Sequence, residues 1–586
     1  MNEELEKLKG DHKLPLSVII RRTLKYISKE KGWFILSLFM LAINVLLDSI
    51  SPLFTSRITD LLVEDSINIK LIINLVLLSF AIMCINQFFL YFESIILQRS
   101  GQRIIYRLRN EIFEHIENMS LNQFTEMPVG SLVTRVTSYT ASMSDLFTGV
   151  FVRILRDLTT LVGVYAIMFY ISPSLSTSLL GVVSIVFIIS YVFSKTIKEF
   201  FRKERAAISD MNTFLSENLS GMKLTQIFNQ EKTKDEQFGV KNNEVLHQRF
   251  NVIKAFGVYR PLISFIYNAS IALCFYLGVR YQLSAGEIVA FYLYMSKFFN
   301  PIQNLADQLN ALQKALTASE RIFNLLDVKP DVLDKEDAIE IDHFEGKIEF
   351  RNVWFAYKDE HWILKDVSFV IEPKQTCAFV GATGAGKTTI LSLIVRNYEI
   401  QKGEILIDDI NINDIKISSL RRAIGQMLQD VFLFSGTIKD NITLHDDSFT
   451  EDEIHEACRY VNADSFIDKL SKGIDEEIIE KGENLSQGQR QLLSFARTVI
   501  HKPQILILDE ATANIDTETE VLIQQSLEKM KSIGTMLVVA HRLSTIQHAD
   551  QIIVLQNGQI VERGNHQQLL KNRGYYYKLY QLQFEN

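Results

Sequence analysis

One short segment combines the residue types that bind phosphate groups. Residues 381–388, Gly-Ala-Thr-Gly-Ala-Gly-Lys-Thr, fit the spacing G-x-x-x-x-G-K-[ST], follow an apolar run and precede a helical pattern. Glycines let backbone N–H groups approach phosphate oxygens, and the start of a helix favours their negative charge. In this pattern the lysine reaches the β- and γ-phosphates and the next hydroxyl is a ligand for Mg²⁺. The segment therefore predicts a site for ATP and Mg²⁺ that uses Lys387 and Thr388.

A second segment supplies carboxylates for the same chemistry. Residues 505–508, Ile-Leu-Ile-Leu, are typical of a buried strand, and Asp509 and Glu510 follow at its end. We expect Asp509 to hold the Mg²⁺ shell and Glu510 to orient or deprotonate the attacking water. An apolar strand that ends in two acids is mostly structural when it occurs alone. The phosphate-binding segment upstream favours the catalytic interpretation here.

Residues 485–497, Leu-Ser-Gln-Gly-Gln-Arg-Gln-Leu-Leu-Ser-Phe-Ala-Arg, resemble the signature helix of ATP-binding-cassette (ABC) ATPases. Other motifs of that family are present in the same order as in the family: Tyr357 matches the A-loop aromatic that stacks on adenine, Gln429 the Q-loop, Asp516 the D-loop and His541 the switch histidine. The resemblance implies two such domains facing head to tail, so that the signature of one chain touches the γ-phosphate held by the other.

The motifs and the resemblance together assign the expected site. Catalysis is assigned to Glu510, His541 and Gln429, and Mg²⁺ binding to Thr388 and Gln429. ATP binding is assigned to Tyr357, Gly381, Thr383, Gly384, Ala385, Gly386, Lys387, Thr388, Thr389 and Asp509, and the signature that acts in trans is Ser486, Gln487, Gly488 and Gln489.

The signature departs from the family pattern at Gln487, where glycine is usual. Together with residues 480–485, it is similar to one subunit type of heterodimeric bacterial ABC exporters, the type that keeps the catalytic glutamate. The resemblance implies that the partner is a second, different half-transporter whose own catalytic glutamate is impaired. Neutral variation within a homodimer is the alternative.

The elements that precede these motifs are apolar. Six runs approach the roughly 20 residues needed to cross a bilayer, at 34–54, 71–97, 150–172, 176–194, 262–281 and 288–305. A basic amphipathic helix at 16–31 is expected to lie on the inner membrane surface.

The connections between the runs set the expected orientation. Those at 98–148 and 195–259 carry 5 and 11 Lys and Arg, whereas the short connections at 55–70, 173–175 and 282–287 carry only Arg57 and Lys70. This bias places the long connections and both termini in the cytoplasm. Their apolar periodicity predicts that the membrane helices continue beyond the lipid.

The chain therefore divides into an expected transmembrane domain at 1–325, an acidic linker at 326–342 and an ATP-binding domain at 343–586. The fold class is an α-helical membrane domain with six spans plus an α/β P-loop ATPase domain with a helical subdomain. This order resembles the ABC exporter half-transporter, in which segments 120–128 and 219–230 match the coupling helices.

Polar residues inside the spans are candidates for a substrate path. Asp48 and Asn44 share one helix face, and Lys297 lies in the sixth span. Glu93 and the cluster formed by Arg153, Arg156 and Asp157 lie near helix ends, where charges usually pair or reach the interface. We expect Glu93 and this cluster to be structural.

The resemblance to ABC exporters thus implies ATP-driven export of small amphiphilic molecules, drugs or lipids, by one half of a dimer, expected to be a heterodimer, in the plasma membrane. An ATP-gated channel, a regulatory membrane ATPase, and a homodimeric lipid or peptide exporter are the alternatives. The net charge of −8 argues against a nucleic-acid partner, and the four cysteines form no CxxC pair. The expected partners are the lipid bilayer, a small-molecule substrate and a second half-transporter.

Overall fold

The computed structural model describes residues 12–64, 67–358, 361–428, 430–509, 517–539 and 546–584. It also leaves the side chains of 302–307, 309–310, 480, 517 and 583–584 outside the description. The described chain forms two compact units. The first comprises residues up to 117 together with 127–328, and the second comprises 118–126 together with the residues from 329 onward.

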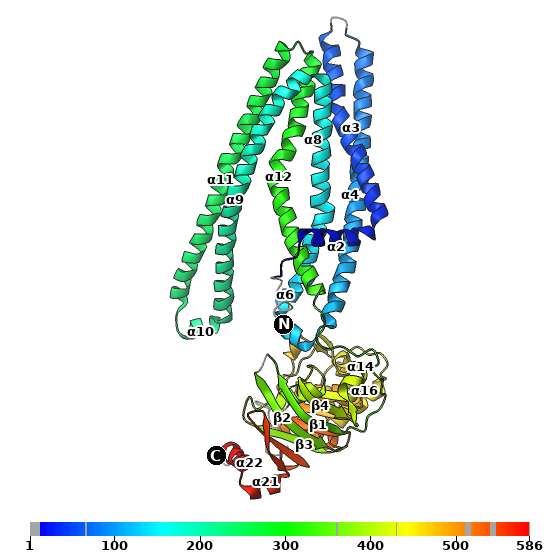
Figure 1. Cartoon of the computed structure of the whole chain (residues 1–586), viewed down its shortest axis with the longest axis vertical. Helices are drawn as coiled ribbons and strands as arrows, with labels where there is room; N and C mark the ends of the chain where they lie inside the picture. The colour runs from blue at the N-terminus through cyan, green and yellow to red at the C-terminus, as the bar shows by residue number, and fades with distance from the viewer. Residues whose placement is uncertain are drawn as a thin grey trace. The chain divides into compact units, whose positions relative to one another are not determined.

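The first unit is built from helices (Figure 1). A surface-type helix, α2 (Leu16–Ser28), precedes six long helical segments, which confirms the expected helical membrane domain. They are α3 (Lys31–Val63), α4 (Ile69–Glu117), the segment Val129–Ile171, α9 (Pro173–Ser220), α11 (Glu231–Arg280) and α12 (Ala285–Leu326). The third segment contains α6 (Val129–Thr134), α7 (Thr140–Asp145) and α8 (Phe151–Ile171), joined by the π-helical turns η1 (Arg135–Tyr139) and η2 (Leu146–Val150).

Five of these segments are long and apolar enough to cross a membrane within the described part of the chain. They correspond to the first five expected spans. The sixth, at 288–305, lies in α12, part of whose side chains fall outside the description.

The expected loop at 55–70 is wrong over most of its length. The helix α3 continues to Val63 and α4 begins at Ile69, so only residues 64–68 connect them. Pro52 lies inside α3 and does not mark its end. Proline is tolerated inside membrane helices because neighbouring groups satisfy the backbone carbonyl that it frees.

Two other connections are short because polar side chains cap the following helices. Ser172 accepts a hydrogen bond from Leu175 N at the start of α9. Ser284 and Glu287 form a reciprocal capping box at the start of α12. Each cap satisfies backbone N–H groups that a helix start leaves unpaired.

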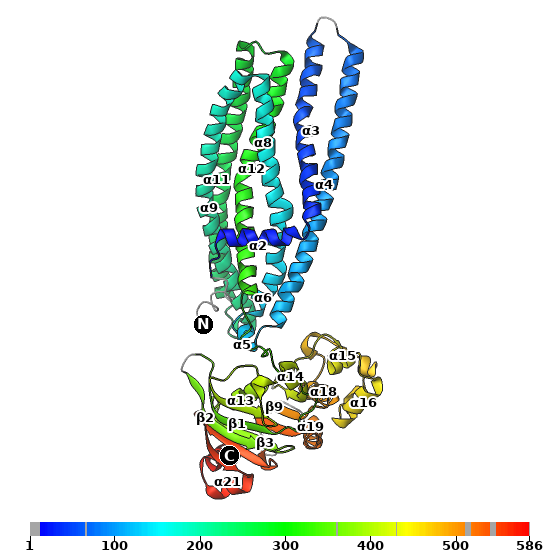
Figure 2. The same ribbon diagram turned by 45° about the vertical axis from the view of Figure 1, so that its right-hand side comes forward.

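The helices α9 and α11 form a long antiparallel pair joined by the short helix α10 (Met222–Ile227) (Figure 1). Aromatic stacking of Phe193 on Tyr259, with centroids 3.9 Å apart, and a 2.9 Å hydrogen bond between the hydroxyls of Ser190 and Tyr259 hold the pair together. The continuity of both helices confirms that they extend past their apolar runs. Figure 2 shows α2 lying across the direction of the long helices.

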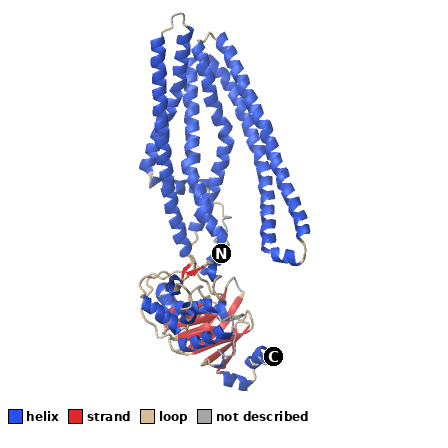
Figure 3. Ribbon diagram, turned by 180° about the vertical axis from the view of Figure 1, so that it is seen from behind, coloured by secondary structure: helices blue, strands red, loops and turns tan. Residues whose placement is uncertain are grey.

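The second unit holds all the named strands (Figure 3). An antiparallel sheet has the order β2-β1-β4-β5, formed by β2 (Trp362–Ile371), β1 (Ile348–Ala356), β4 (Lys402–Ile407) and β5 (Ile410–Asn411). A six-stranded sheet has the order β12-β11-β3-β10-β9-β6, formed by β12 (Gln559–Gly564), β11 (Gln551–Gln556), β3 (Thr376–Gly381), β10 (Thr535–Val539), β9 (Ile505–Asp509) and β6 (Ile424–Met427). β12 alone runs antiparallel to its neighbour in this sheet.

Helices pack around these sheets and form a separate cluster beside them. The helix α13 (Lys387–Ile394) follows β3, and α14 (Ile417–Ala423), α19 (Thr517–Met530), α21 (His566–Asn572) and α22 (Tyr575–Phe584) complete the α/β part. The helical subdomain contains α15 (Ile438–Thr443), α16 (Glu451–Tyr460), α17 (Asp464–Ile467) and α18 (Gln487–Ile500), with the short β7 (Gly436–Thr437) and β8 (Glu477–Ile478). The expected α/β ATPase fold with its helical subdomain is confirmed.

Candidate functional site

The phosphate-binding segment is the turn between β3 and α13. Gly384 and Gly386 have φ angles of 81° and 104°, in the region that side chains rarely adopt. A Cβ on Gly381 would lie 2.4 Å from the carbonyl oxygen of Leu555. The backbone therefore needs glycine at these positions, and it leaves an open cradle at the start of α13 that suits a phosphate group.

Lys387 lies over this turn. Its Nζ donates hydrogen bonds to the carbonyl oxygens of Gly381 and Ala382, at 2.7 and 3.2 Å, and its side chain is buried. Burial lowers the pKa of the Lys387 amine, while the Asp509 carboxylate opposes part of that shift. The amine is thus positioned to exchange neutral carbonyl acceptors for charged phosphate oxygens.

Tyr357 follows β1 and is held close to α13. Its hydroxyl lies 3.1 Å from Thr389 Oγ1, and its ring contacts Phe355 and Tyr398 edge-to-face at 4.9 and 5.1 Å between centroids. The side chain remains 40% exposed. These contacts fix the ring and leave part of its surface available for stacking on a planar base.

Parallel strand order brings the second motif to the same sheet edge. Val539 of β10 pairs with both Asp509 of β9 and Phe379 of β3, so Asp509 lies at the sheet edge where β3 leads into the phosphate-binding turn. The Asp509 carboxylate and the exposed hydroxyl of Thr388 supply the oxygen ligands that Mg²⁺ prefers. Thr383 is also exposed on the turn, whereas Ala385 is buried beneath it.

Four expected site residues lie outside the described residues. They are Gln429, Glu510, Asp516 and His541. In the sequence, Glu510 directly follows Asp509, and His541 comes two residues after Val539.

The signature residues form the start of α18. Ser486 is its N-cap and makes a capping box with Gln489, through bonds of 2.9 and 3.2 Å. The side chains of Ser486 and Gln487 are exposed, and Gly488 is buried. The start of α18 therefore presents a serine and a long amide side chain to the surface of this chain.

Asn441 and Arg497 support the segment after the Q-loop, and the sequence did not single them out. Asn441 is buried and exchanges hydrogen bonds of 2.8 Å with the backbone N and O of Phe434. Arg497 of α18 donates to the carbonyl oxygens of Asn441 and Phe432, at 2.8 and 3.1 Å. The signature helix is thereby tied to residues 432–434. A single asparagine far from any motif gives no sequence signal for such a role.

The segment at 120–128, expected to be a coupling helix, contains α5 (Leu121–Thr125) and lies mostly in the second unit. Gln123 is buried and donates to Lys329 O at 2.6 Å and to Asp331 Oδ1 at 2.9 Å. Glu126 forms a 2.6 Å ion pair with Lys358, next to Tyr357. The segment at 120–128 is therefore joined both to the start of the linker and to the segment after β1 that carries the A-loop aromatic.

The polar residues of the spans pair with one another. Lys297 of α12 lies 2.6 Å from Asp48 Oδ2 in α3, and Asn44 donates to Asn86 Oδ1 of α4 at 2.8 Å. Each contact joins two different helices. The three candidate path residues therefore have protein partners in this structure.

A second ion pair joins α8 to α4. Arg156 donates to both carboxylate oxygens of the buried Glu93, at 2.7 and 2.9 Å. Arg153 donates instead to the carbonyl oxygen of Gly149, in its own helical segment, at 3.1 Å. The pairing of Glu93 with Arg156 fits the structural role expected for them.

Comparisons with known proteins cover both units. The family model described as ABC transporter transmembrane region matches residues 34–302, and the one described as ABC transporter matches residues 364–513. An uncharacterised ABC transporter ATP-binding protein of Bacillus subtilis is 35% identical over 571 residues, covering 97% of this chain and 94% of that protein.

Two further relatives have more specific descriptions. A probable multidrug resistance ABC transporter ATP-binding/permease protein of Bacillus subtilis is 38% identical over 88% of this chain and 77% of its own length. An ATP-dependent lipid A-core flippase of Syntrophus aciditrophicus is 34% identical over 84% of this chain and 83% of its own length.

One solved structure has the same fold along nearly the whole chain. The structure of a bacterial Atm1-family ABC exporter with ATP bound is 25% identical and has a TM-score of 0.78, covering 97% of this chain and 99% of that one. With the P-loop geometry and the fused helical unit, these matches show that the chain belongs to the ABC transporter family, as an ATP-hydrolysing half-transporter of the exporter type.

Proposed function

We propose that this ABC exporter moves small amphiphilic molecules, drugs or lipids, and that it takes them up through a cavity between α8, α9 and α12. The cavity has a volume of about 520 Å³. Its lining is almost entirely apolar and includes Leu158, Leu161, Tyr165, Phe187 and Phe298. This size and lining fit a small ligand with a substantial apolar part.

The same cavity holds one carboxylate, Asp157. Gln308 donates a hydrogen bond to it, and among the described residues it has no cationic partner. The stretch 302–310, much of which is not described, contains neither Lys nor Arg. Asp48, in contrast, is already balanced by Lys297. Asp157 is therefore the carboxylate available to a positively charged substrate group.

The observation that carries this proposal is an uncompensated carboxylate at an apolar cavity, and replacing it is the test. We expect Asp157→Asn to lower the efflux of a lipophilic cation by about tenfold, the effect of one lost charged contact. Efflux of a neutral amphiphile of similar size should change little. Both are measured in vesicles that contain the transporter and its partner.

Asp145→Asn is the matched control, because Asp145 is an exposed carboxylate of the same helical segment that does not line the cavity. Equal loss of cationic and neutral efflux in Asp157→Asn would indicate a folding defect. Unchanged cation efflux in that variant would contradict the proposed substrate site.

The ATP site is proposed to use its residues as follows. Tyr357 stacks on adenine, the backbone of 381–389 surrounds the phosphates, and Lys387 neutralises their charge. Thr388, Gln429 and Asp509 would hold Mg²⁺, which supplies charge stabilisation at the β- and γ-phosphates. Glu510 orients the attacking water, His541 contacts the γ-phosphate, and Asp516 contributes the D-loop.

Dimerisation completes that site, because ABC half-transporters act in pairs. We propose that Ser486, Gln487, Gly488 and Gln489 reach across to the ATP of a partner chain that is a different half-transporter with an impaired catalytic glutamate. The exposed side chain of Gln487 at the first position of α18 supports this assignment, since it adds bulk where the phosphates must approach. The chain would then supply Glu510 to the one competent site.

The proposed location is the plasma membrane, with both termini and the ATPase domain in the cytoplasm. Eleven Lys and Arg in the connection at 195–259 support this orientation. Labelling from either side of the membrane tests it, as described for α10 in the Discussion.

A further inference from the structure

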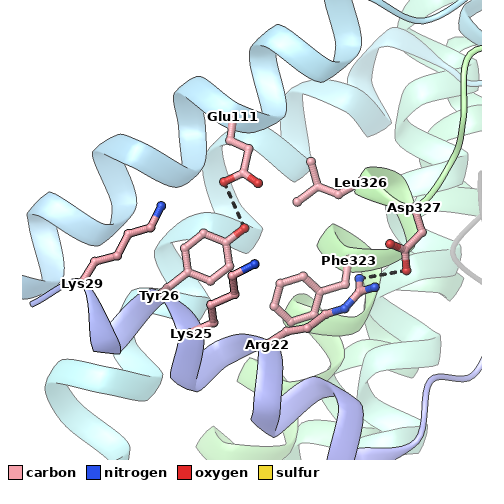
Figure 4. Close-up of a pocket in the computed structure, with 8 residues that line it drawn as sticks. All are labelled: Arg22, Lys25, Tyr26, Lys29, Glu111, Phe323, Leu326 and Asp327. Atoms are coloured by element: carbon pink, nitrogen blue, oxygen red, sulfur yellow. Dashed lines mark hydrogen bonds and ion pairs between the residues drawn. The ribbon is translucent and has the colours of Figure 1, made fainter. Parts of the chain in front are cut away.

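A cavity of about 290 Å³ lies where α2 meets α4 and the end of α12 (Figure 4). Arg22, Lys25, Tyr26 and Lys29 come from α2 and the residue beyond its end, Glu111 from α4, and Phe323, Leu326 and Asp327 from the end of α12. Figure 4 shows the side chains of Arg22, Lys25 and Tyr26 directed from α2 into this space. Its volume suits a ligand the size of a lipid head group rather than a drug.

The two carboxylates of the cavity already have partners. Asp327 pairs with Arg22 at 2.8 Å, and Glu111 accepts a hydrogen bond from Tyr26 at 3.0 Å. The ring of Phe323 packs against Arg22 and Tyr26 of α2. Its centroid is 5.6 Å from the Arg22 guanidinium and 6.3 Å from the centroid of the Tyr26 ring. These contacts form a fixed wall.

Two cations of the cavity have no direct partner among the described residues, and its lining as a whole has an excess of positive charge, with the three cations Arg22, Lys25 and Lys29 against the two carboxylates Glu111 and Asp327. Lys25 and Lys29 are exposed, and neither side chain has a hydrogen bond or ion pair within the part of the chain that the structure describes. They are four residues apart and so share one face of the helical turn. The excess positive charge of the cavity is therefore carried by the two adjacent ammonium groups of Lys25 and Lys29. They lie next to the wall formed by the ion pair, the hydrogen bond and the aromatic contacts described above.

The opposite face of α2 is apolar. Leu16, Ile20 and Leu24 are 55%, 44% and 52% exposed and recur every four residues, so they form one stripe. At 100° per residue this stripe lies about half a turn away from Arg22, Lys25 and Lys29. A helix of this kind inserts its apolar face at the edge of the acyl chains, which brings its polar face to the level of the phosphates.

We propose that the cavity is a binding site for a phosphate group, supplied by the head group of an anionic phospholipid of the adjacent leaflet. Lys25 and Lys29 bind the phosphate oxygens, and Phe323 and Leu326 contact the carbon atoms next to them. The apolar stripe favours a lipid over a soluble phosphate ester as the source, because it holds the cavity at the membrane surface. A bound head group would join α2 to the end of α12.

The test measures binding of phosphatidylglycerol to the full-length chain in neutral detergent by native mass spectrometry. Lys25→Gln/Lys29→Gln should weaken binding by about 30-fold, the loss expected for two lysine contacts with an anionic head group. Lys25→Arg/Lys29→Arg should retain binding, because charge and hydrogen-bond donors are kept. Phosphatidylcholine, which carries no net charge, should bind all variants weakly.

Arg21→Gln/Lys31→Gln is the matched control. Both residues are exposed near the same membrane surface but do not line the cavity, so this variant removes two charges without touching the site. It should bind phosphatidylglycerol within about twofold of the unmodified chain. Equal weakening of both glutamine variants, or of neither, would overturn the proposal.

A competition arm distinguishes the two sources of phosphate. Glycerol phosphate should displace phosphatidylglycerol only at far higher concentration, because it lacks the acyl chains that anchor the lipid. If glycerol phosphate displaced phosphatidylglycerol at equal concentration, the phosphate site would be supported, but its ligand would be a soluble ester and not a lipid. None of these results depends on the exported substrate or on ATP hydrolysis.

Discussion

At the scale of single residues, the ATP site depends on the backbone conformation of the phosphate-binding turn and on the fixed ring of Tyr357. Gly384 and Gly386 adopt φ angles that favour glycine, and Lys387 lies over the turn they make. Tyr357 contacts other parts of the domain through Thr389 and Tyr398. Its hydroxyl contacts α13, whereas its ring is the part proposed to stack on the base, so the two roles can be tested separately.

This separation gives a prediction for two variants of Tyr357. Tyr357→Leu removes the stacking surface and should raise the KM for ATP by about tenfold, within the range measured for loss of one base–aromatic stack. Tyr357→Phe keeps the ring and loses only one hydrogen bond, so its KM should rise by no more than about threefold. Steady-state ATP hydrolysis measures both. Similar KM values for the two variants would exclude stacking as the role of the ring.

At the scale of elements, the helices exceed the membrane that they cross. The 48 residues of α9 span about 70 Å, whereas the hydrocarbon core is about 30 Å thick. The apolar part of α9 lies toward its start, so its polar end projects away from the lipid with α10 at the tip. Basic residues concentrated in this projection support the proposed cytoplasmic placement.

Labelling of single cysteines tests that placement. In a chain whose exposed Cys84 is replaced by serine, Lys223→Cys in α10 should react with a membrane-impermeant maleimide only in inside-out vesicles. Asn68→Cys, in the connection between α3 and α4, should react in intact cells and serves as the opposite-side control. Reaction of Lys223→Cys in intact cells would reverse the proposed orientation.

At the scale of the whole molecule, the chain is one half of a working transporter. The described structure forms two units, and the signature at the start of α18 is exposed on this chain, away from bonds to its own P-loop. ATP bound between two chains can hold them together only if both surfaces approach the phosphates closely. In the proposed dimer, the exposed side chain of Gln487 would lie where these two surfaces approach each other.

We therefore predict low ATPase activity for the chain purified alone. Gln487→Gly should raise that activity several-fold by removing the side chain, whereas Gln487→Ala, which keeps a Cβ, should raise it less. Glu510→Gln sets the inactive baseline. High, cooperative activity of the unmodified chain that Gln487→Gly leaves unchanged would favour a homodimer over the proposed pairing.

The sequence by itself determined the order of the parts and the local chemistry. The glycine spacing before Lys387, the strand that ends at Asp509 and the apolar runs of the helical unit were all recognisable, because each depends on residues close together in the chain. The ends of the helices were harder to predict from the sequence. The first connection was expected to begin at residue 55, whereas α3 continues to Val63 with Pro52 inside it, since surrounding helices offset the local effect of proline.

Only the tertiary structure decided which polar residues pair and which remain available. It joined Lys297 to Asp48, left Asp157 at an apolar cavity, and placed Lys25 and Lys29 beside Phe323 from a helix nearly 300 residues away. The sequence gives the type of a charged residue but does not show whether an opposite charge neutralises it. Its partner is set by the packing of distant helices, and that packing determines what the charge can bind.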